Sequence, residues 1–131
     1  MMVIEEMDVY AIAYQATLKL YKITVGFPVE ERYGIISQMR KAAVSVVSNM
    51  SEGSARGTTK DYARFLVMAR GSVAELKTQL LLSRDLGYAK EEDINDVIED
   101  MTRVKMMLNK MIAKFDPKQD DSRLPTPDLR K

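Results

Sequence analysis

Apolar residues recur at alternating steps of three and four along nearly the whole chain. Breaks in this spacing, mostly at Gly and Pro, divide the sequence into four segments: residues 3–25, 34–54, 59–86 and 91–115. Steps of three and four place side chains on one face of an α-helix, so each segment predicts an amphipathic helix. Because the links are short, successive helices are expected to be antiparallel neighbours. The sequence therefore predicts an all-α fold, an antiparallel up-down-up-down four-helix bundle over residues 1–115.

The apolar stripe of each segment predicts which face meets the core. The first stripe is Ile4, Met7, Ala11, Tyr14, Leu18, Tyr21 and Val25. The second is Ile36, Met39, Ala43, Val46, Val47 and Met50. The third is Tyr62, Leu66, Ala69, Val73, Leu76 and Leu80. The fourth is Val97, Met101, Val104, Leu108, Met111 and Phe115.

Glycines and one capping pattern mark the helix ends. Gly53 and Gly57 bracket the exit of the second helix, and Gly87 is placed to stop the third. Thr58 and Asp61 have the spacing of a capping box, so the third helix is expected to begin next to Thr58. Residues 116–131 are charged and contain three prolines, which predicts a flexible tail.

Composition narrows the chemistry that this chain can perform. The sequence contains neither Cys nor His, so disulfides, thiolate metal sites and the commonest general base are excluded. We therefore expect no catalytic residues, no metal and no cofactor. No apolar run approaches the roughly 20 residues that span a bilayer, and the N-terminus lacks the pattern of a signal peptide. We expect a cytoplasmic protein that does not contact membranes.

The second helix also carries an orderly polar face. Ser and Asn are poor helix formers, so their recurrence here suggests a role in contacts. We interpret this face as a hydrogen-bonding seam toward the third helix or a neighbouring subunit; the alternative is phosphate contact by its cationic members. Opposite the core stripe, within an arc of roughly 100°, lie Lys41, Ser45, Ser48, Asn49, Glu52 and Arg56.

Gly71 lies on the outward face of the third helix, together with Leu82. A mid-helix Gly costs about 0.5–1 kcal/mol relative to Ala, so close approach of another helix or of a ligand explains its presence. The alternative is neutral drift. A subunit interface is further indicated by apolar residues away from the core stripes, namely Val44, Val67 and Leu81. We expect a homo-oligomer.

Basic residues are in modest excess on the second and third helices. Residues 26–87 contain nine Lys or Arg against six Asp or Glu. The alternative to a nucleic-acid surface is a set of salt-bridged helix faces. The candidates for binding RNA or DNA are Arg40, Lys41, Arg56, Lys60, Arg64, Arg70, Lys77 and Arg84.

The remaining polar residues of these two helices predict a structural network rather than a catalytic site. Unpaired charge is costly to bury, so we expect the carboxylates of Glu52 and Glu75 to pair with nearby Arg side chains. The predicted polar network or interface comprises Gln38, Ser45, Asn49, Glu52, Gly71, Ser72 and Glu75.

An ordered series of motifs resembles one bacterial family. The series is Phe27-Pro28, Glu31-x-Tyr33-Gly34-Ile35, Gln38-Met39-Arg40-Lys41-Ala42-Ala43-Val44-Ser45, Asn49-Met50-Ser51-Glu52-Gly53, Phe65-Leu66 and Ala69-Arg70-Gly71-Ser72-x-x-Glu75-Leu76. Over about residues 3–113 it resembles the 23S ribosomal RNA intervening-sequence proteins. That family is related to the accessory variability determinant of diversity-generating retroelements.

The resemblance implies a small four-helix bundle that assembles as a ring, typically a homopentamer. In the retroelement relatives the ring is basic, binds nucleic acid and partners a reverse transcriptase. This chain is nearly neutral, which departs from that pattern. The first hypothesis is a non-enzymatic oligomer that binds RNA or other nucleic acid through the second and third helices. The alternative is a structural or protein-interaction module, such as a reverse-transcriptase accessory protein, that binds no nucleic acid.

Overall fold

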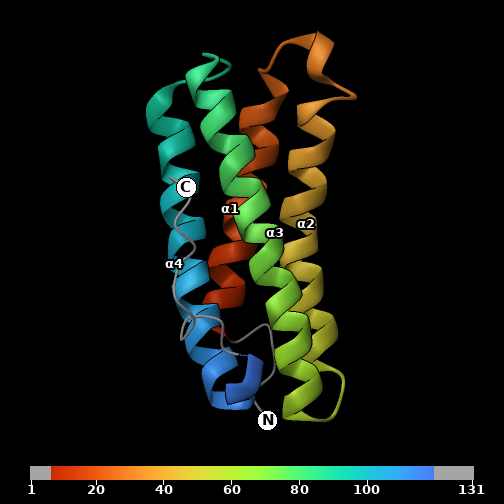
Figure 1. Cartoon of the computed structure of the whole chain (residues 1–131). Helices are drawn as coiled ribbons and strands as arrows, with labels where there is room; N and C mark the ends of the chain where they lie inside the picture. The colour runs from red at the N-terminus through yellow and green to blue at the C-terminus, as the bar shows by residue number, and fades with distance from the viewer. Residues whose placement is uncertain (1–6, 120–131) are drawn as a thin grey trace, which may run out of the picture.

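A computed structural model describes residues 7–119 and shows four α-helices packed side by side (Figure 1). No strand is present in this part of the chain, and successive helices run in opposite directions, so the predicted all-α antiparallel bundle is confirmed. The helices are α1 (Asp8–Val25), α2 (Ile35–Ser54), α3 (Thr59–Asp85) and α4 (Glu91–Phe115), with short 3-10 helices η2 (Val29–Glu31) and η3 (Pro117–Gln119).

Each long helix packs against two others. Helix α1 contacts α2 and α4, and α3 contacts the same two. Helices α1 and α3 therefore occupy diagonal corners of the bundle, and α1 passes behind α3 in Figure 1. Their outward faces consequently look in opposite directions.

The core stripes of α2, α3 and α4 lie close to their predicted positions. All six residues of the predicted α3 stripe are buried. In α2, Val47 is only half-buried. In the last turns of α4, Ile112 is fully buried while Met111 and Phe115 are half-buried, because the core position shifts by one residue there.

The predicted core face of α1 is wrong. Of its residues within α1, Tyr14, Leu18 and Val25 are 47, 45 and 78% exposed, and they point to solvent. Ile4, from the same stripe, lies outside the described residues. The face that packs into the bundle consists of smaller and partly polar residues, namely Val9, Ala13, Ala16, Thr17, Leu20 and Thr24.

The buried face of α1 is possible because its two threonines satisfy their own hydroxyl groups. Thr17 Oγ1 donates to the Ala13 carbonyl oxygen at 2.8 Å, and Thr24 Oγ1 donates to the Leu20 carbonyl oxygen at 2.8 Å. Bonded in this way, each threonine buries a methyl group without leaving an unsatisfied polar atom. Ala13 also leaves room for α1 to approach its neighbours closely.

Lys19 of α1 forms ion pairs with two carboxylates of α4, which join the two helices. Lys19 Nζ lies 2.8 Å from Asp96 and 2.9 Å from Asp100. The pKa of Lys19 is raised above its ordinary value. The hydrogen bond to Asp96 has the largest effect, and the hydrogen bond to Asp100 has the next largest. The contact is partly exposed, so it contributes to register more than to stability.

Both ends of α3 carry the predicted stop and start signals. Asp61 N–H donates to Thr58 Oγ1 at 3.1 Å, and the helix begins at the next residue, Thr59. At the other end, Gly87 has a φ of 74°, a left-handed conformation that glycine adopts without strain. Tyr88 N–H then donates to the Ser83 carbonyl oxygen at 3.0 Å, which closes a Schellman motif.

Helix α2 ends at Ser54, within the exit that Gly53 and Gly57 are predicted to bracket. Gly53 itself is buried inside the last turn. A Cβ atom at this position would lie 2.7 Å from Phe65 Cβ and 3.1 Å from Tyr62 Cδ1. The glycine therefore allows α2 and α3 to come close just before the link that joins them. Gly57, at φ 92°, makes the turn.

The chain ends are described only in part. Residues 117–119, in the predicted tail, form η3, which packs on α3 and α4. The rest of that tail, residues 120–131, and the predicted first turn of α1 lie outside the described residues. Among the helices of residues 7–119, none combines the length and the apolar composition that a bilayer span requires.

Candidate functional site

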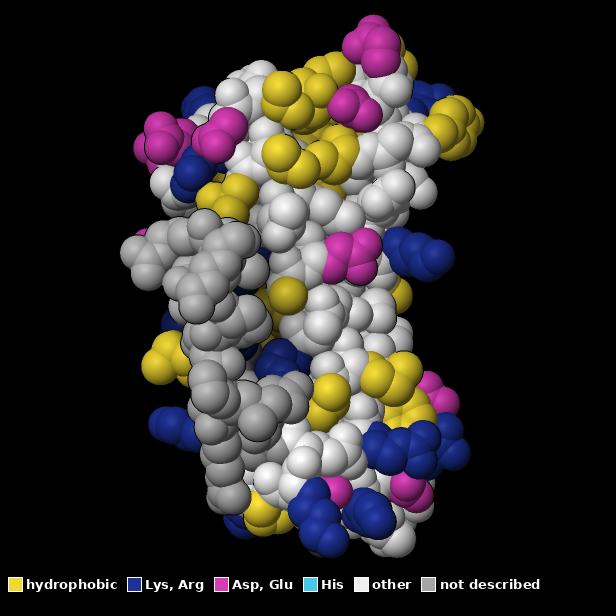
Figure 2. All heavy atoms as spheres, viewed as in Figure 1, with side chains coloured by type: hydrophobic (Ala, Val, Ile, Leu, Met, Phe, Trp, Pro, Cys, Tyr) yellow, Lys and Arg dark blue, Asp and Glu magenta, His cyan; other side chains and the backbone are white. Residues whose placement is uncertain are grey.

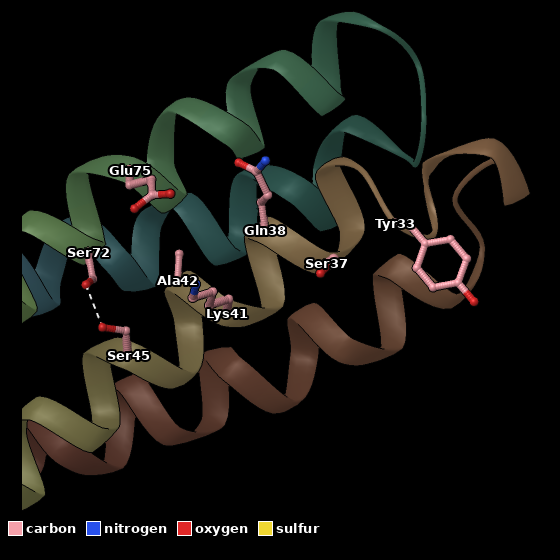
Figure 3. A pocket seen from close by; sticks show the side chains of 8 residues that line it. All are labelled: Tyr33, Ser37, Gln38, Lys41, Ala42, Ser45, Ser72 and Glu75. Carbon is pink, nitrogen blue, oxygen red and sulfur yellow. Dashed lines mark hydrogen bonds between the residues drawn. The ribbon is translucent and has the colours of Figure 1, made fainter.

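A polar groove of about 440 Å³ runs between α2 and α3 (Figure 3). We call it the α2–α3 groove. Most of its lining comes from one face of α2, and Tyr33 stands at the end where that helix begins. The lining residues are Tyr33, Ser37, Gln38, Lys41, Ala42, Ser45, Ser72 and Glu75.

The floor of the groove contains the hydrogen-bonding seam that the polar face of α2 predicts. Ser45 and Ser72 share a hydrogen bond of 2.9 Å between their hydroxyl oxygens, which joins α2 to α3. Asn49 Nδ2 donates to the Ser45 carbonyl oxygen at 2.9 Å and to Ser45 Oγ at 3.0 Å. Asn49 thus supports the seam from within α2.

Several polar groups of the groove, and of Gln79 one turn beyond its lining residue Glu75, are not fully used. Gln79 Nε2 donates to Glu75 Oε1 at 3.2 Å, so this carboxylate pairs with an amide and not with the predicted arginine. Gln79 Oε1 is buried and has no hydrogen-bond partner within residues 7–119. Neither Gln38 nor Lys41 makes a side-chain hydrogen bond or ion pair in that range.

Three of the predicted basic residues lie on the side of α3 that faces α4. Arg70, Lys77 and Arg84 are spaced by seven residues, so they share one helix face. Arg70 Nη1 donates to Asn109 Oδ1 at 2.8 Å, and Arg84 Nη1 donates to Asn95 Oδ1 at 2.9 Å. These two hydrogen bonds join α3 to α4 at two points along the helices.

Arg40 serves the contact between α1 and α2. Its Nε donates to Thr24 Oγ1 at 3.0 Å, and its Nη2 donates to the Tyr21 carbonyl oxygen at 3.3 Å. The guanidinium also stands 4.6 Å from the centre of the Tyr21 ring. The predicted basic residues thus do not form one surface, because Arg40 and the α3–α4 group face different neighbours.

Arg56, Lys60 and Arg64 do come together, around the link between α2 and α3. All three are exposed. Arg56 pairs with Glu52 at 3.1 Å, and Arg64 pairs with Asp61 at 3.3 Å. Exposed pairs of this kind are worth about 0–1 kcal/mol, so a phosphate can displace them.

Three exposed lysines that the sequence reasoning did not assign to the site lie at the same end of the bundle. The end of α4 lies beside the start of α3, where the Phe115 and Tyr62 rings stack 5.1 Å apart. The predicted antiparallel order of the helices already places the end of the fourth helix beside the start of the third, so it indicates that their basic residues lie close together. Figure 2 shows dark-blue side chains gathered at this lower end. We call the six residues the basic end: Arg56, Lys60, Arg64, Lys110, Lys114 and Lys118.

The opposite end of the bundle is acidic. Glu30 and Glu31 lie in η2, and the first turn of α4 holds Glu91, Glu92 and Asp93. Magenta side chains are visible at the upper end in Figure 2. Tyr88 donates to Glu31 Oε2 at 2.7 Å, and this hydrogen bond raises the pKa of Tyr88. Charge is therefore segregated along the long axis of the molecule.

The described residues show no cluster of three or more acidic side chains placed to hold a metal ion. Glu75 is the one carboxylate in the lining of the α2–α3 groove. The site residues thus offer hydrogen bonds and positive charge, the chemistry of contact with phosphates or with polar protein surfaces.

Comparison with known proteins agrees with the motif series. The family model of the 23S rRNA-intervening sequence protein matches residues 5–110. The fold is similar to a 1.70 Å crystal structure of a protein of unknown function from the S23 ribosomal protein family of Bacteroides thetaiotaomicron VPI-5482. That likeness has a TM-score of 0.71 at 19% sequence identity and covers 79% of this chain and 97% of the other. No curated protein matches the sequence.

Proposed function

Because the chain belongs to the family of 23S rRNA-intervening sequence proteins, we propose that it is a non-enzymatic, self-associating bundle that binds RNA through its basic end. The observation that carries this proposal is the gathering of six exposed Lys and Arg side chains from the α2–α3 link, α3, α4 and η3. Among them, Lys60, Lys110, Lys114 and Lys118 have no ion pair within residues 7–119.

Phosphate contact fits the chemistry of these side chains. Lys and Arg bind the backbone of a nucleic acid by neutralising phosphates and releasing counterions, which needs no base-specific pocket. One chain offers few such contacts. Self-association repeats the basic end, so several weak contacts act together on one RNA molecule. The ring of five copies that the resemblance implies is the arrangement we favour.

Removing two lysines of the basic end tests this function. We expect the double variant Lys110→Gln, Lys114→Gln to bind a stem–loop RNA more weakly than the unmodified protein. The slope of log K against log salt should fall by about one per lysine that contacts phosphate. Electrophoretic shifts or fluorescence anisotropy over a salt series measure both quantities, and a DNA duplex of the same sequence serves as the second ligand.

A matched variant controls for net charge. The pair Arg32→Gln, Lys90→Gln removes the same charge from exposed positions at the acidic end. It should leave the affinity and the salt slope nearly unchanged. If the unmodified protein gives no shift with RNA even at low salt, the RNA-binding proposal is wrong.

A second candidate is a protein-interaction module that binds no nucleic acid. The α2–α3 groove favours it, because Lys41, Gln38 and the 89% exposed Tyr33 offer polar and aromatic contacts that the described chain leaves unused. A partner protein such as a reverse transcriptase is the occupant that the resemblance suggests. In that case substitutions in the groove weaken partner binding, while substitutions at the basic end have no effect.

A further inference from the structure

The outward face of α1 is an apolar stripe whose side chains are exposed in the described chain, although Arg40 of α2 stands over the Tyr21 ring. Its steps of three and four are those of a helix seam that packs against a second helix. Leu18, at its centre, is 45% exposed. We call this set the α1 stripe: Ala11, Tyr14, Leu18, Tyr21 and Val25.

The outward face of α3 carries a stripe with the same spacing. Met68 and Leu82 are each 53% exposed, and Gly71 lies between them. A Cβ atom at Gly71 would meet nothing within 4 Å, so packing inside the chain does not require this glycine. A gap at the middle of an exposed helix face can receive a large side chain from another helix. The α3 stripe is Met68, Gly71, Glu75, Thr78 and Leu82.

The two stripes lie at matching heights on opposite sides of the molecule. Helices α1 and α3 begin at the same end, where Tyr62 OH donates to Met7 Sδ at 3.4 Å. At a rise of 1.5 Å per residue, Leu18 lies about 15 Å and Gly71 about 18 Å from that end. When two copies stand side by side in the same orientation, Leu18 of one faces Gly71 of the next.

Charges beside the stripes favour that shared orientation. Heights are again measured from the end where α1 and α3 begin. Asp8 and Lys60 both lie within about 2 Å of that end, and Lys22 and Glu75 lie about 21 and 24 Å from it. Each pair joins opposite charges between copies. The reversed orientation instead brings Lys22 toward Arg64, which costs free energy.

We propose that the α1 stripe of one copy packs on the α3 stripe of the next, with the Leu18 side chain against Gly71. The two surfaces differ, so the contact is heterologous and propagates from copy to copy until the rotation closes a ring. This inference rests on the self-association in the proposed function, and it names the surfaces that perform it.

Two variants, each blocking one stripe, test the contact. Leu18→Glu places a charge in the α1 stripe, and Gly71→Leu fills the gap in the α3 stripe, where an added Cβ atom meets nothing within 4 Å. We expect light scattering to give a multiple of the 14.9 kDa chain mass for the unmodified protein and one chain for each variant. An equimolar mixture of the two variants should give twice the mass of one chain. The intact α3 stripe of Leu18→Glu can still pack on the intact α1 stripe of Gly71→Leu.

Controls and contrary outcomes separate the alternatives. Met106→Glu, an equivalent change on exposed α4, should keep the unmodified mass. A dimer formed by Gly71→Leu alone shows that α1 stripes pair with each other, which overturns the proposal. An assembly that tolerates both substitutions also overturns it. The double variant Lys110→Gln, Lys114→Gln should keep the assembled mass of the unmodified protein while it binds RNA more weakly. Its RNA affinity therefore tests the RNA-binding proposal separately from the contact between copies. A monomeric unmodified protein refutes the contact and the self-association together.

Discussion

Leu20→Ala should lower the free energy of unfolding by about 2–5 kcal/mol. Leu20 is fully buried in α1 as part of the hydrophobic core, so its truncation leaves a cavity there. A loss of this size is a large part of the 5–15 kcal/mol that typically stabilises a domain. Chemical denaturation should show a lower midpoint with an unchanged slope.

Leu18→Ala is the matched control, because it makes the same change two residues away on the exposed face. We expect its free energy of unfolding to differ by less than about 0.5 kcal/mol from that of the unmodified protein. The measurement belongs at concentrations where the chain is monomeric, since Leu18 lies in the α1 stripe. Equal losses from the two substitutions contradict the orientation of α1 described above.

Gly53→Ala should destabilise the protein by about 1–3 kcal/mol although alanine is the better helix former. The new methyl group collides with Phe65 Cβ, an atom close to the α3 backbone, and with the Tyr62 ring. Phe65 Cβ moves only with the α3 backbone, so the methyl group pushes α2 and α3 apart. Thermal or chemical unfolding measures the loss.

Gly71→Ala makes the same substitution in open space and should have the opposite sign. We expect a gain of about 0.5–1 kcal/mol, measured in the monomeric Leu18→Glu background so that assembly does not contribute. If both glycine substitutions stabilise the chain, the close approach at Gly53 is absent.

The sequence predicts α3 well and α1 poorly, and the reason is physical. Helix α3 has one apolar stripe with a regular period, so its buried face follows from spacing alone. Helix α1 has two apolar faces. The larger residues, such as Tyr14, point outward. The buried face includes Thr17, whose sequence identity indicates a polar position, but its hydroxyl group is hydrogen-bonded within its own helix.

The candidate site was predictable in its parts but not in its arrangement. The motif residues of α2 and α3 do line one groove, because spacing puts Gln38, Lys41 and Ser45 on one helix face. The distribution of the basic residues depends on which neighbour each helix face meets. Spacing within a single helix does not contain that information, so it groups Arg40 and Arg70 with residues that lie elsewhere.

The segregation of charge gives the molecule an electric dipole along its length. The net charge of +1 is small, so the attraction of the whole chain to a distant polyanion is weak. Within a Debye length, about 10 Å at 0.1 M salt, the field of a polyanion exerts a torque on this dipole and turns the basic end toward the polyanion. If the chain binds RNA as proposed, it therefore approaches the RNA already oriented, and raising the ionic strength slows productive encounters even where the final contacts are unchanged.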